Sequence, residues 1–318
     1  MRRRFRALFV LLCILYLAGT ILGGIGLGWM ATHPGRRPIS DLEKQEVIAA
    51  AGTGAELRDV SIPASDGAIL RAREIRPTDS NGNAVILLHG VGDNRLGVSG
   101  YGTWLVRNHY TVLLPDARAH GYSDGDLATY GLKESDDIHR WVDWLESDAH
   151  PDCVFGFGES MGAAQIFESL TKETRYCAVI AESPFATFRE VAYARFGRPF
   201  HTGAWLGRTF FWPTVEVGFL YVREKFGLKM ELASPADAVA HSNVPVFLIH
   251  GLSDENIPAY HSVEIQARNL SRRVTLWRVA GAVHCGTHSI APKEFERRVL
   301  DWFTEHSARV PNQAVAAN

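Results

Sequence analysis

Apolar and polar positions along the chain form three patterns, and each predicts a different kind of segment. Residues Ala7 to Met30 contain no charged side chain, and residues 55 to 76 alternate between apolar and polar positions. From Ala84 onward, short apolar runs alternate with stretches of helical spacing. That alternation is typical of a mostly parallel sheet with helices on both faces. We therefore predict an α/β fold that follows an apolar N-terminal segment.

The apolar N-terminal segment is long enough to span a membrane. Its uncharged run covers 24 residues, whereas a bilayer needs about 20 and a secretory signal core has about 7–15. A cluster of arginines before such a run is expected to stay in the cytoplasm. We predict a membrane anchor with the rest of the chain on the extracytoplasmic side. The alternative is a secreted protein, because Leu17-Ala18-Gly19 offers small residues for cleavage; the arginines are Arg2, Arg3, Arg4 and Arg6.

A motif of two glycines around a serine lies between a predicted strand and a predicted helix. The sequence Gly158-Glu159-Ser160-Met161-Gly162 follows the apolar run Cys153–Phe157 and precedes the helix-compatible stretch Ala163–Phe167. A serine on so tight a turn needs glycine neighbours, because larger side chains would collide with the strand and the helix. The pattern predicts a nucleophile elbow with Ser160 as the nucleophile.

Two later strands supply an acid and a histidine. The run Val244–His250 leads into Asp254, and the run Val274–Val279 leads into His284. The chain order Ser, Asp, His is that of α/β-hydrolases rather than either protease order. We predict that His284 is the general base for Ser160 and that Asp254 orients it. The competing candidates are Glu182 and Asp237 for the acid, His288 for the base and Cys285 for the nucleophile, while Asp254 has the alternative role of capping a helix near Ile257.

The predicted strand Asn83–Leu88 ends in a glycine-rich loop that suits an oxyanion hole. A carbonyl oxygen under attack becomes negatively charged and needs backbone N–H groups aimed at it. The N–H of Met161, at the start of the helix, is one predicted donor. The second is the N–H of Val91, which has a glycine on each side. We expect His89, His120, Asp116 and Arg118 to order the surrounding loops through hydrogen bonds.

These segments together resemble the α/β-hydrolases, particularly membrane-anchored α/β-hydrolase-domain proteins related to the serine aminopeptidase and esterase branches. The resemblance covers residues 55 to 306 approximately. It implies a mostly parallel eight-stranded sheet, helices on both faces and a helical cap insertion, but it does not specify the substrate. The segments that carry it are Leu87–Gly90, Asp116–Ser123, Thr129–Gly131 with Glu134 and Asp137, Gly158–Gly162, Ser183–Ala186, His250–Asp254 and Gly281–His284.

The resemblance and the composition divide the chain into four parts. Residues 1–31 form the anchor, 32–54 a linker and short helix, 55–307 the hydrolase domain, and 308–318 a disordered tail. The connection between the strands that end near Glu182 and begin near Val244 is about 60 residues, too long for a simple crossover. It is rich in aromatic residues, so we expect a helical cap at about 186–240. We expect some of its aromatic side chains to form an apolar acyl- or aryl-binding wall and others to form the cap's own core and docking surface.

The predicted activity is that of a serine hydrolase that cleaves an ester, with an apolar acyl ester favoured, through an acyl-enzyme. An aminopeptidase, amidase, thioesterase or acyltransferase would use the same triad, and these alternatives stay open. In the cap, Glu216 and Glu224 are too isolated to indicate a site for a peptide N-terminus. A non-catalytic binding protein with this fold is disfavoured, because Ser160, Asp254 and His284 are all present.

The composition of the chain limits the classes of binding partner that we expect. A net charge of −2 over 318 residues gives no reason to expect nucleic acid. The sequence has no metal-ligand spacing, phosphate loop or dinucleotide fingerprint, so we predict no metal or cofactor. The predicted partners are a small-molecule or lipid-like ester and, through the N-terminal segment, the membrane. Cys153 and Cys177 begin two predicted neighbouring strands, where a disulfide is geometrically possible, but we favour two small buried residues.

Overall fold

The computed structural model describes residues 2–41, 54–269 and 273–307. The short helix predicted within residues 32–54 falls mainly on 42–53, which lie outside the described residues, as does the predicted tail 308–318.

Eight strands form one sheet in the order β1-β2-β4-β3-β5-β6-β7-β8. β2 runs antiparallel to β1 and β4, and every other neighbouring pair is parallel. The predicted α/β class and mostly parallel eight-stranded sheet are therefore confirmed. The strands are β1 (Glu56–Pro63), β2 (Ile69–Arg76), β3 (Asn83–Leu88), β4 (Thr111–Pro115), β5 (Cys153–Glu159), β6 (Tyr176–Glu182), β7 (Val246–Gly251) and β8 (Val274–Val279).

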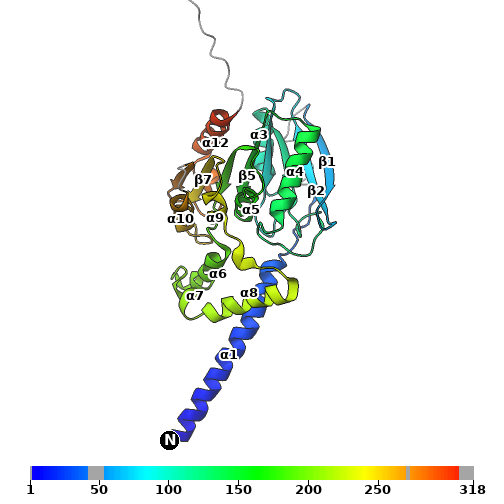
Figure 1. Ribbon diagram of the computed structural model, residues 1–318. Helices are drawn as coiled ribbons and strands as arrows, with labels where there is room; N and C mark the ends of the chain where they lie inside the picture. Colours follow the sequence, from blue (N-terminus) through cyan, green and yellow to red (C-terminus); the bar gives the residue numbers. More distant parts are fainter. Residues whose placement is uncertain (1, 42–53, 270–272, 308–318) are drawn as a thin grey trace, which may run out of the picture.

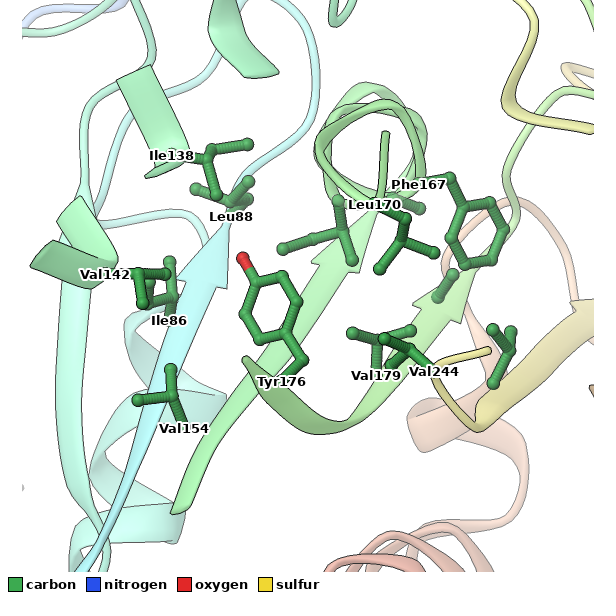
Figure 2. Close-up of a cluster of buried hydrophobic side chains, with 14 of the residues drawn as sticks. Ile86, Leu88, Ile138, Val142, Val154, Phe167, Leu170, Tyr176, Val179 and Val244 are labelled. Carbon is green, nitrogen blue, oxygen red and sulfur yellow. The ribbon is translucent and has the colours of Figure 1, made fainter. Parts of the chain in front are cut away.

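Helices cover both faces of the sheet, because the central strands are apolar on both sides. In β3, Ile86 and Leu88 belong to one buried cluster, whereas Val85 and Leu87 belong to the other. The first cluster packs the sheet against α4 (Glu134–Asp148), α5 (Met161–Ser169), α9 (Pro235–Ala240) and α10 (Tyr260–Arg268), and the second against α3 (Ser99–Arg107) and α12 (Pro292–His306). Figure 2 shows part of the first cluster, with Ile86, Leu88, Ile138, Val142, Phe167 and Leu170 among the labelled side chains.

A separate helical layer lies between β6 and β7 in the chain. It contains α6 (Phe188–Gly197), α7 (Trp205–Thr209) and α8 (Trp212–Phe226), and in Figure 1 it lies beyond the sheet, on the side from which the N-terminal helix emerges. We call these three helices the cap. Short helical elements complete the fold: η1 (Arg198–Phe200), η2 (Met230–Leu232) and α11 (Thr287–Ile290).

The N-terminal segment is one long helix, α1 (Arg2–Thr32). It is long and apolar enough to cross a membrane and lies near the N-terminus, as a membrane anchor or a signal sequence would. Figure 1 shows that α1 passes the cap before it reaches the hydrolase domain. The buried residues of α1 recur every four positions and are small: Thr20, Gly24, Gly28 and Thr32.

The interpretation of Cys153 and Cys177 as two separate buried residues was wrong. The structure joins them in a disulfide across β5 and β6, with their Cα atoms 5.8 Å apart. The pairing register explains the contact: Val154 pairs with Tyr176 but Phe155 pairs with Ala178. Cys177 is the extra residue of this β-bulge, which the sequence pattern does not reveal.

Candidate active site

Ser160 lies on the sharp turn between β5 and α5. Its backbone has φ 52° and ψ −114°, a conformation that a non-glycine residue adopts only at a cost of about 1–3 kcal/mol. At both glycines of the motif there is no room for a side chain. A Cβ on Gly158 would lie 2.4 Å from the carbonyl of Gly162, and a Cβ on Gly162 would lie 2.4 Å from the backbone oxygen of Leu88. The turn is fixed by a 2.8 Å hydrogen bond that the Ser160 N–H donates to the Glu182 backbone oxygen.

The structure brings together the three side chains predicted from the loops after β5, β7 and β8. Ser160 Oγ lies 2.8 Å from His284 Nε2, and His284 Nδ1 lies 2.7 Å from Asp254 Oδ2. Both distances are within hydrogen-bonding range. One ring nitrogen of His284 is therefore available to the serine hydroxyl while the other is held by the carboxylate.

Asp254 is a buried carboxylate in a polar setting. Its Oδ1 accepts hydrogen bonds of 2.9 Å from the N–H groups of Asn256 and Ile257, and its other oxygen contacts His284. The alternative role as a helix cap near Ile257 was wrong, because α10 begins only at Tyr260 and has no side-chain cap. Burial disfavours its charge, but hydrogen bonds from His250 and His284 outweigh burial and hold the pKa of Asp254 well below its usual range. Asp254 is therefore ionised at neutral pH. His250 was not singled out from the sequence for this contact.

Two buried histidines hold the loop that carries Val91. His89 Nδ1 donates to the backbone oxygen of Gly90 over 2.8 Å, and its Nε2 accepts from the Ala117 N–H. His120 Nε2 accepts a 3.1 Å hydrogen bond from the Gly92 N–H. Burial lowers the pKa of both histidines, so both are neutral near pH 7. The expectation that they order this loop is confirmed by these contacts.

The predicted oxyanion donors lie at the same cavity as the serine. Met161 is the first residue of α5, where an N–H has no acceptor within the helix. Val91, Met161 and Ser160 all line one cavity of about 490 Å³. Val91 and Met161 thus line the same space as Ser160, and the role of their N–H groups as oxyanion donors stays a prediction.

The competing residues lie elsewhere or have other contacts. Glu182 is buried, and its carboxylate accepts a hydrogen bond from the Thr287 N–H at 3.0 Å. Asp237 pairs with Arg268 on the surface. His288 Nε2 lies 3.2 Å from a Glu296 carboxylate oxygen. Burial raises the pKa of the Cys285 thiol, which makes it a poor nucleophile.

The sequence analysis assigned no role to Glu159, a partly buried carboxylate next to Ser160. Glu159 pairs with Glu182 across β5 and β6, so two acidic side chains end neighbouring strands. Burial first, and then the nearby charge of Glu182, raise the pKa of Glu159 to about 8. Strand alignment could have revealed this pair, since each glutamate ends its apolar run in the sequence.

The cavity beside Ser160 is mainly apolar and lies under the cap. Its volume falls in the range of about 300–1,000 Å³ that is typical of small-molecule sites. The cap aromatics divide between the two predicted roles, since some line the cavity and others do not. Phe196 and Phe211 stack on one another at 4.7 Å. Of the aromatics that line the cavity, Phe188 and Phe219 belong to the cap, whereas Tyr130 and Phe185 precede it in the chain. Large exposed aromatics of the connection include Phe200, Trp205, Phe210 and Trp212.

The N-terminal helix also contributes to the cavity wall, a contact that the sequence pattern does not predict. Leu27, Gly28, Met30 and Ala31 of α1 line it, together with Pro34 just beyond the helix. No short-range sequence signal marks this contact, because α1 and α8 are separated by about 180 residues of chain. Among residues 2–41, 54–269 and 273–307, no group of three or more His, Cys, Asp or Glu side chains is placed to hold a metal ion.

Comparison with known proteins agrees with this architecture. The model of the alpha/beta hydrolase family matches residues 85–298. The uncharacterized protein YqkD of Bacillus subtilis (strain 168) is 28% identical over 203 residues, which cover 62% of this chain and 63% of YqkD. The uncharacterized protein YfhR of Escherichia coli (strain K12) is 27% identical over 223 residues, covering 70% of this chain and 66% of YfhR. The match therefore spans a little under two thirds of these relatives.

Solved structures with the same fold include esterases and peptidases. The Pyrococcus furiosus esterase Pf2001 superposes with a TM-score of 0.69 at 24% identity, covering 87% of this chain and 98% of the esterase. A Pyrococcus horikoshii acylaminoacyl peptidase superposes with a TM-score of 0.59 at 17% identity, covering 83% of this chain and 43% of the peptidase. At these identities the likeness concerns the fold.

Proposed function

Since the chain belongs to the alpha/beta hydrolase family, and its structural neighbours include esterases and peptidases, we propose that it is a serine hydrolase that cleaves an apolar acyl ester. One observation carries the proposal: Ser160, His284 and Asp254 form a continuous hydrogen-bonded series at 2.8 and 2.7 Å. The series ends in a cavity that is large enough for an acyl chain.

The roles follow from proton transfer. A serine hydroxyl is a weak nucleophile at neutral pH, so His284 takes its proton as Ser160 Oγ attacks the acyl carbon. The ionised carboxylate of Asp254 holds the imidazole in the required tautomer and stabilises its positive charge. His284 then protonates the leaving alcohol, and an acyl-enzyme remains on Ser160. Water, deprotonated by His284, attacks the acyl carbon and releases the acid.

The N–H groups of Met161 and Val91 receive the negative oxygen of the tetrahedral intermediate. Removing one such donor in other hydrolases costs about 2.7–4 kcal/mol of transition-state stabilisation. The hydrogen bonds of His89 and His120 fix the loop of Val91 before substrate binds, so that little reorganisation is needed during the reaction.

The contacts of two glutamates in the cap favour an ester over a peptide as the substrate. Glu216 is paired with Arg189 and accepts a 2.9 Å hydrogen bond from the Tyr193 hydroxyl, while Glu224 lies 3.4 Å from Arg223. Because each glutamate already has an arginine partner, neither is positioned to bind the ammonium group of a peptide N-terminus. The apolar cavity beside Ser160 suits an acyl chain instead.

The proposal includes an anchor at the membrane. α1 would span the bilayer with its N-terminal arginines in the cytoplasm, which places the catalytic domain on the extracytoplasmic side. The Cys153–Cys177 disulfide supports that side, because disulfides persist in oxidising compartments. Retention in the membrane after alkaline extraction, and activity of a C-terminal alkaline phosphatase fusion, are the expected results. Release of the protein into the medium would contradict the anchor.

Fluorophosphonate labelling of the full-length protein in detergent tests the mechanism. We expect a single adduct on Ser160, mapped by mass spectrometry, that Ser160→Ala abolishes and Cys285→Ala retains. Rates on p-nitrophenyl butyrate and on the matching p-nitroanilide then compare ester with amide cleavage. A folded protein without label on Ser160 would refute the mechanism, and a faster anilide reaction would refute the ester preference.

A further inference from the structure

The C-terminal end of the N-terminal helix lies in the wall of the cavity that contains Ser160. Leu27, Gly28, Met30 and Ala31 line the same space as the serine. Building on the proposed function, we propose that this end of α1 is a wall of the acyl-binding pocket. The pocket is then complete only with the membrane helix in place, and it takes the acyl chain of an ester that resides in the bilayer.

Small residues hold α1 directly against the backbone of the cap. A Cβ on Gly24 would lie 2.6 Å from Val217 Cβ and 2.7 Å from the backbone oxygen of Thr214. A Cβ on Gly28 would lie 2.9 Å from the backbone oxygen of Gly218. A glycine every four residues is the arrangement that lets two helices pack closely in a membrane. The position of the pocket wall therefore depends on this α1–α8 contact.

The end of α1 is also fixed to the hydrolase domain. The Tyr130 hydroxyl donates a 3.0 Å hydrogen bond to the backbone oxygen of Ala31, and the Ala128 N–H donates a 2.9 Å bond to that of Thr32. The ring of Tyr130, 4.5 Å from that of Phe188, lines the cavity as well. The wall formed by α1 is thus held from the cap and from the hydrolase domain.

The cap lies beside α1 at a depth that lipid would occupy if α1 spans the bilayer. The uncharged stretch Ala7–Met30 is about 36 Å long as a helix, against a hydrocarbon core of about 30 Å. The Tyr16 hydroxyl donates a 2.9 Å bond to the Phe210 backbone oxygen, about 21 Å of helix before Met30. Trp205 and Trp212 nearby are 64% and 49% exposed, and Figure 1 shows the cap on the side of the free half of α1. A cap at this depth lets an acyl chain pass from the bilayer to Ser160 without crossing water.

Displacing α1 from α8 tests the proposal that α1 forms a wall of the acyl-binding pocket. Leucine at position 24 collides with α8, whereas leucine at position 26, where nothing lies within 4 Å, makes the same substitution without a collision. Gly24 does not line the cavity, so its new side chain does not fill the pocket. In phosphatidylcholine vesicles, we expect Gly24→Leu to lower the ratio of kcat/KM for a dodecanoyl over an acetyl p-nitrophenyl ester at least about tenfold. Gly26→Leu should keep the wild-type ratio, and equal ratios in all three proteins would overturn the proposal.

A binding measurement separates this proposal from the proposed function. Ser160→Ala protein in the same vesicles is irradiated with a dodecanoyl ester that carries a diazirine at its terminal carbon. We expect crosslinks on residues 27–34 and on Phe188 or Phe219 that excess unlabelled dodecanoyl ester removes, while crosslinks on residues 8–15, which face lipid, persist. Crosslinks on 27–34 that resist competition would overturn the proposal. Because this readout needs no catalysis, it remains valid if Ser160 takes no fluorophosphonate label.

Discussion

Gly162→Ala is the sharpest test of how the elbow and the oxyanion loop depend on one another. Gly162 lies in the first turn of α5, against the end of β3. The added Cβ would lie 2.4 Å from the backbone oxygen of Leu88 and 2.8 Å from that of His89. Both atoms belong to backbone that leads directly to Val91, so no side chain can rotate away to make room.

The structure gives the size of the effect. To restore ordinary van der Waals contact, the Leu88 oxygen or α5 must move by about 1 Å. A displacement of about 1 Å at a catalytic group can lower the rate about 100-fold, and overpacking costs about 1–3 kcal/mol of unfolding free energy. Alanine also favours a helix over glycine by about 1 kcal/mol, which offsets part of the loss of stability but none of the loss of rate.

Fluorophosphonate labelling rates, kcat/KM on p-nitrophenyl acetate and Tm measure these effects. The matched control is Gly100→Ala in α3, where the new Cβ meets nothing within 4 Å. We expect about a 100-fold loss of kcat/KM in Gly162→Ala, with a lower Tm, and wild-type values in Gly100→Ala. A Gly162→Ala protein with a wild-type labelling rate would refute the argument that the elbow fixes the oxyanion loop.

Three further predictions concern single groups. Asp254→Asn should lower kcat by about 10⁴, as in a protease triad that loses its acid, and initial rates within tenfold of wild type would assign the role of orienting His284 to Glu182 instead. Glu159 keeps its proton in the folded protein up to about pH 8 but loses it near pH 4.5 when unfolded, so its contribution to stability is complete below about pH 4.5 and is lost as the pH rises towards 8. Glu159→Gln should therefore raise Tm relative to wild type at pH 8.5 but not at pH 4.5, and parallel Tm curves for the two proteins would contradict the raised pKa. Replacing Cys153 and Cys177 by alanine removes a link between residues 24 positions apart and should cost about 3.5 kcal/mol, seen as a lower Tm that dithiothreitol also produces in wild type but not in the double variant.

Much of the hydrolase domain could be predicted because its signals are local. Strands β3 and β8 have the predicted bounds, since apolar runs depend only on neighbours in the chain. The elbow at Ser160 was predictable for the same reason, because strand, turn and helix follow one another directly. The loops that carry Asp254 and His284 follow strands of one parallel sheet, and such loops meet at the same edge.

The sequence by itself thus determined the fold class, the long apolar N-terminal segment and the residues that meet at Ser160. Only the tertiary structure decided the disulfide, because a β-bulge rather than a spacing brings Cys153 to Cys177. Only the tertiary structure joined Gly24 and Gly28 to α8 and so placed α1 in the wall of the cavity. The physical reason is the same in both cases: close approach of distant backbones depends on how whole elements pack, and small residues permit that approach without specifying the partner.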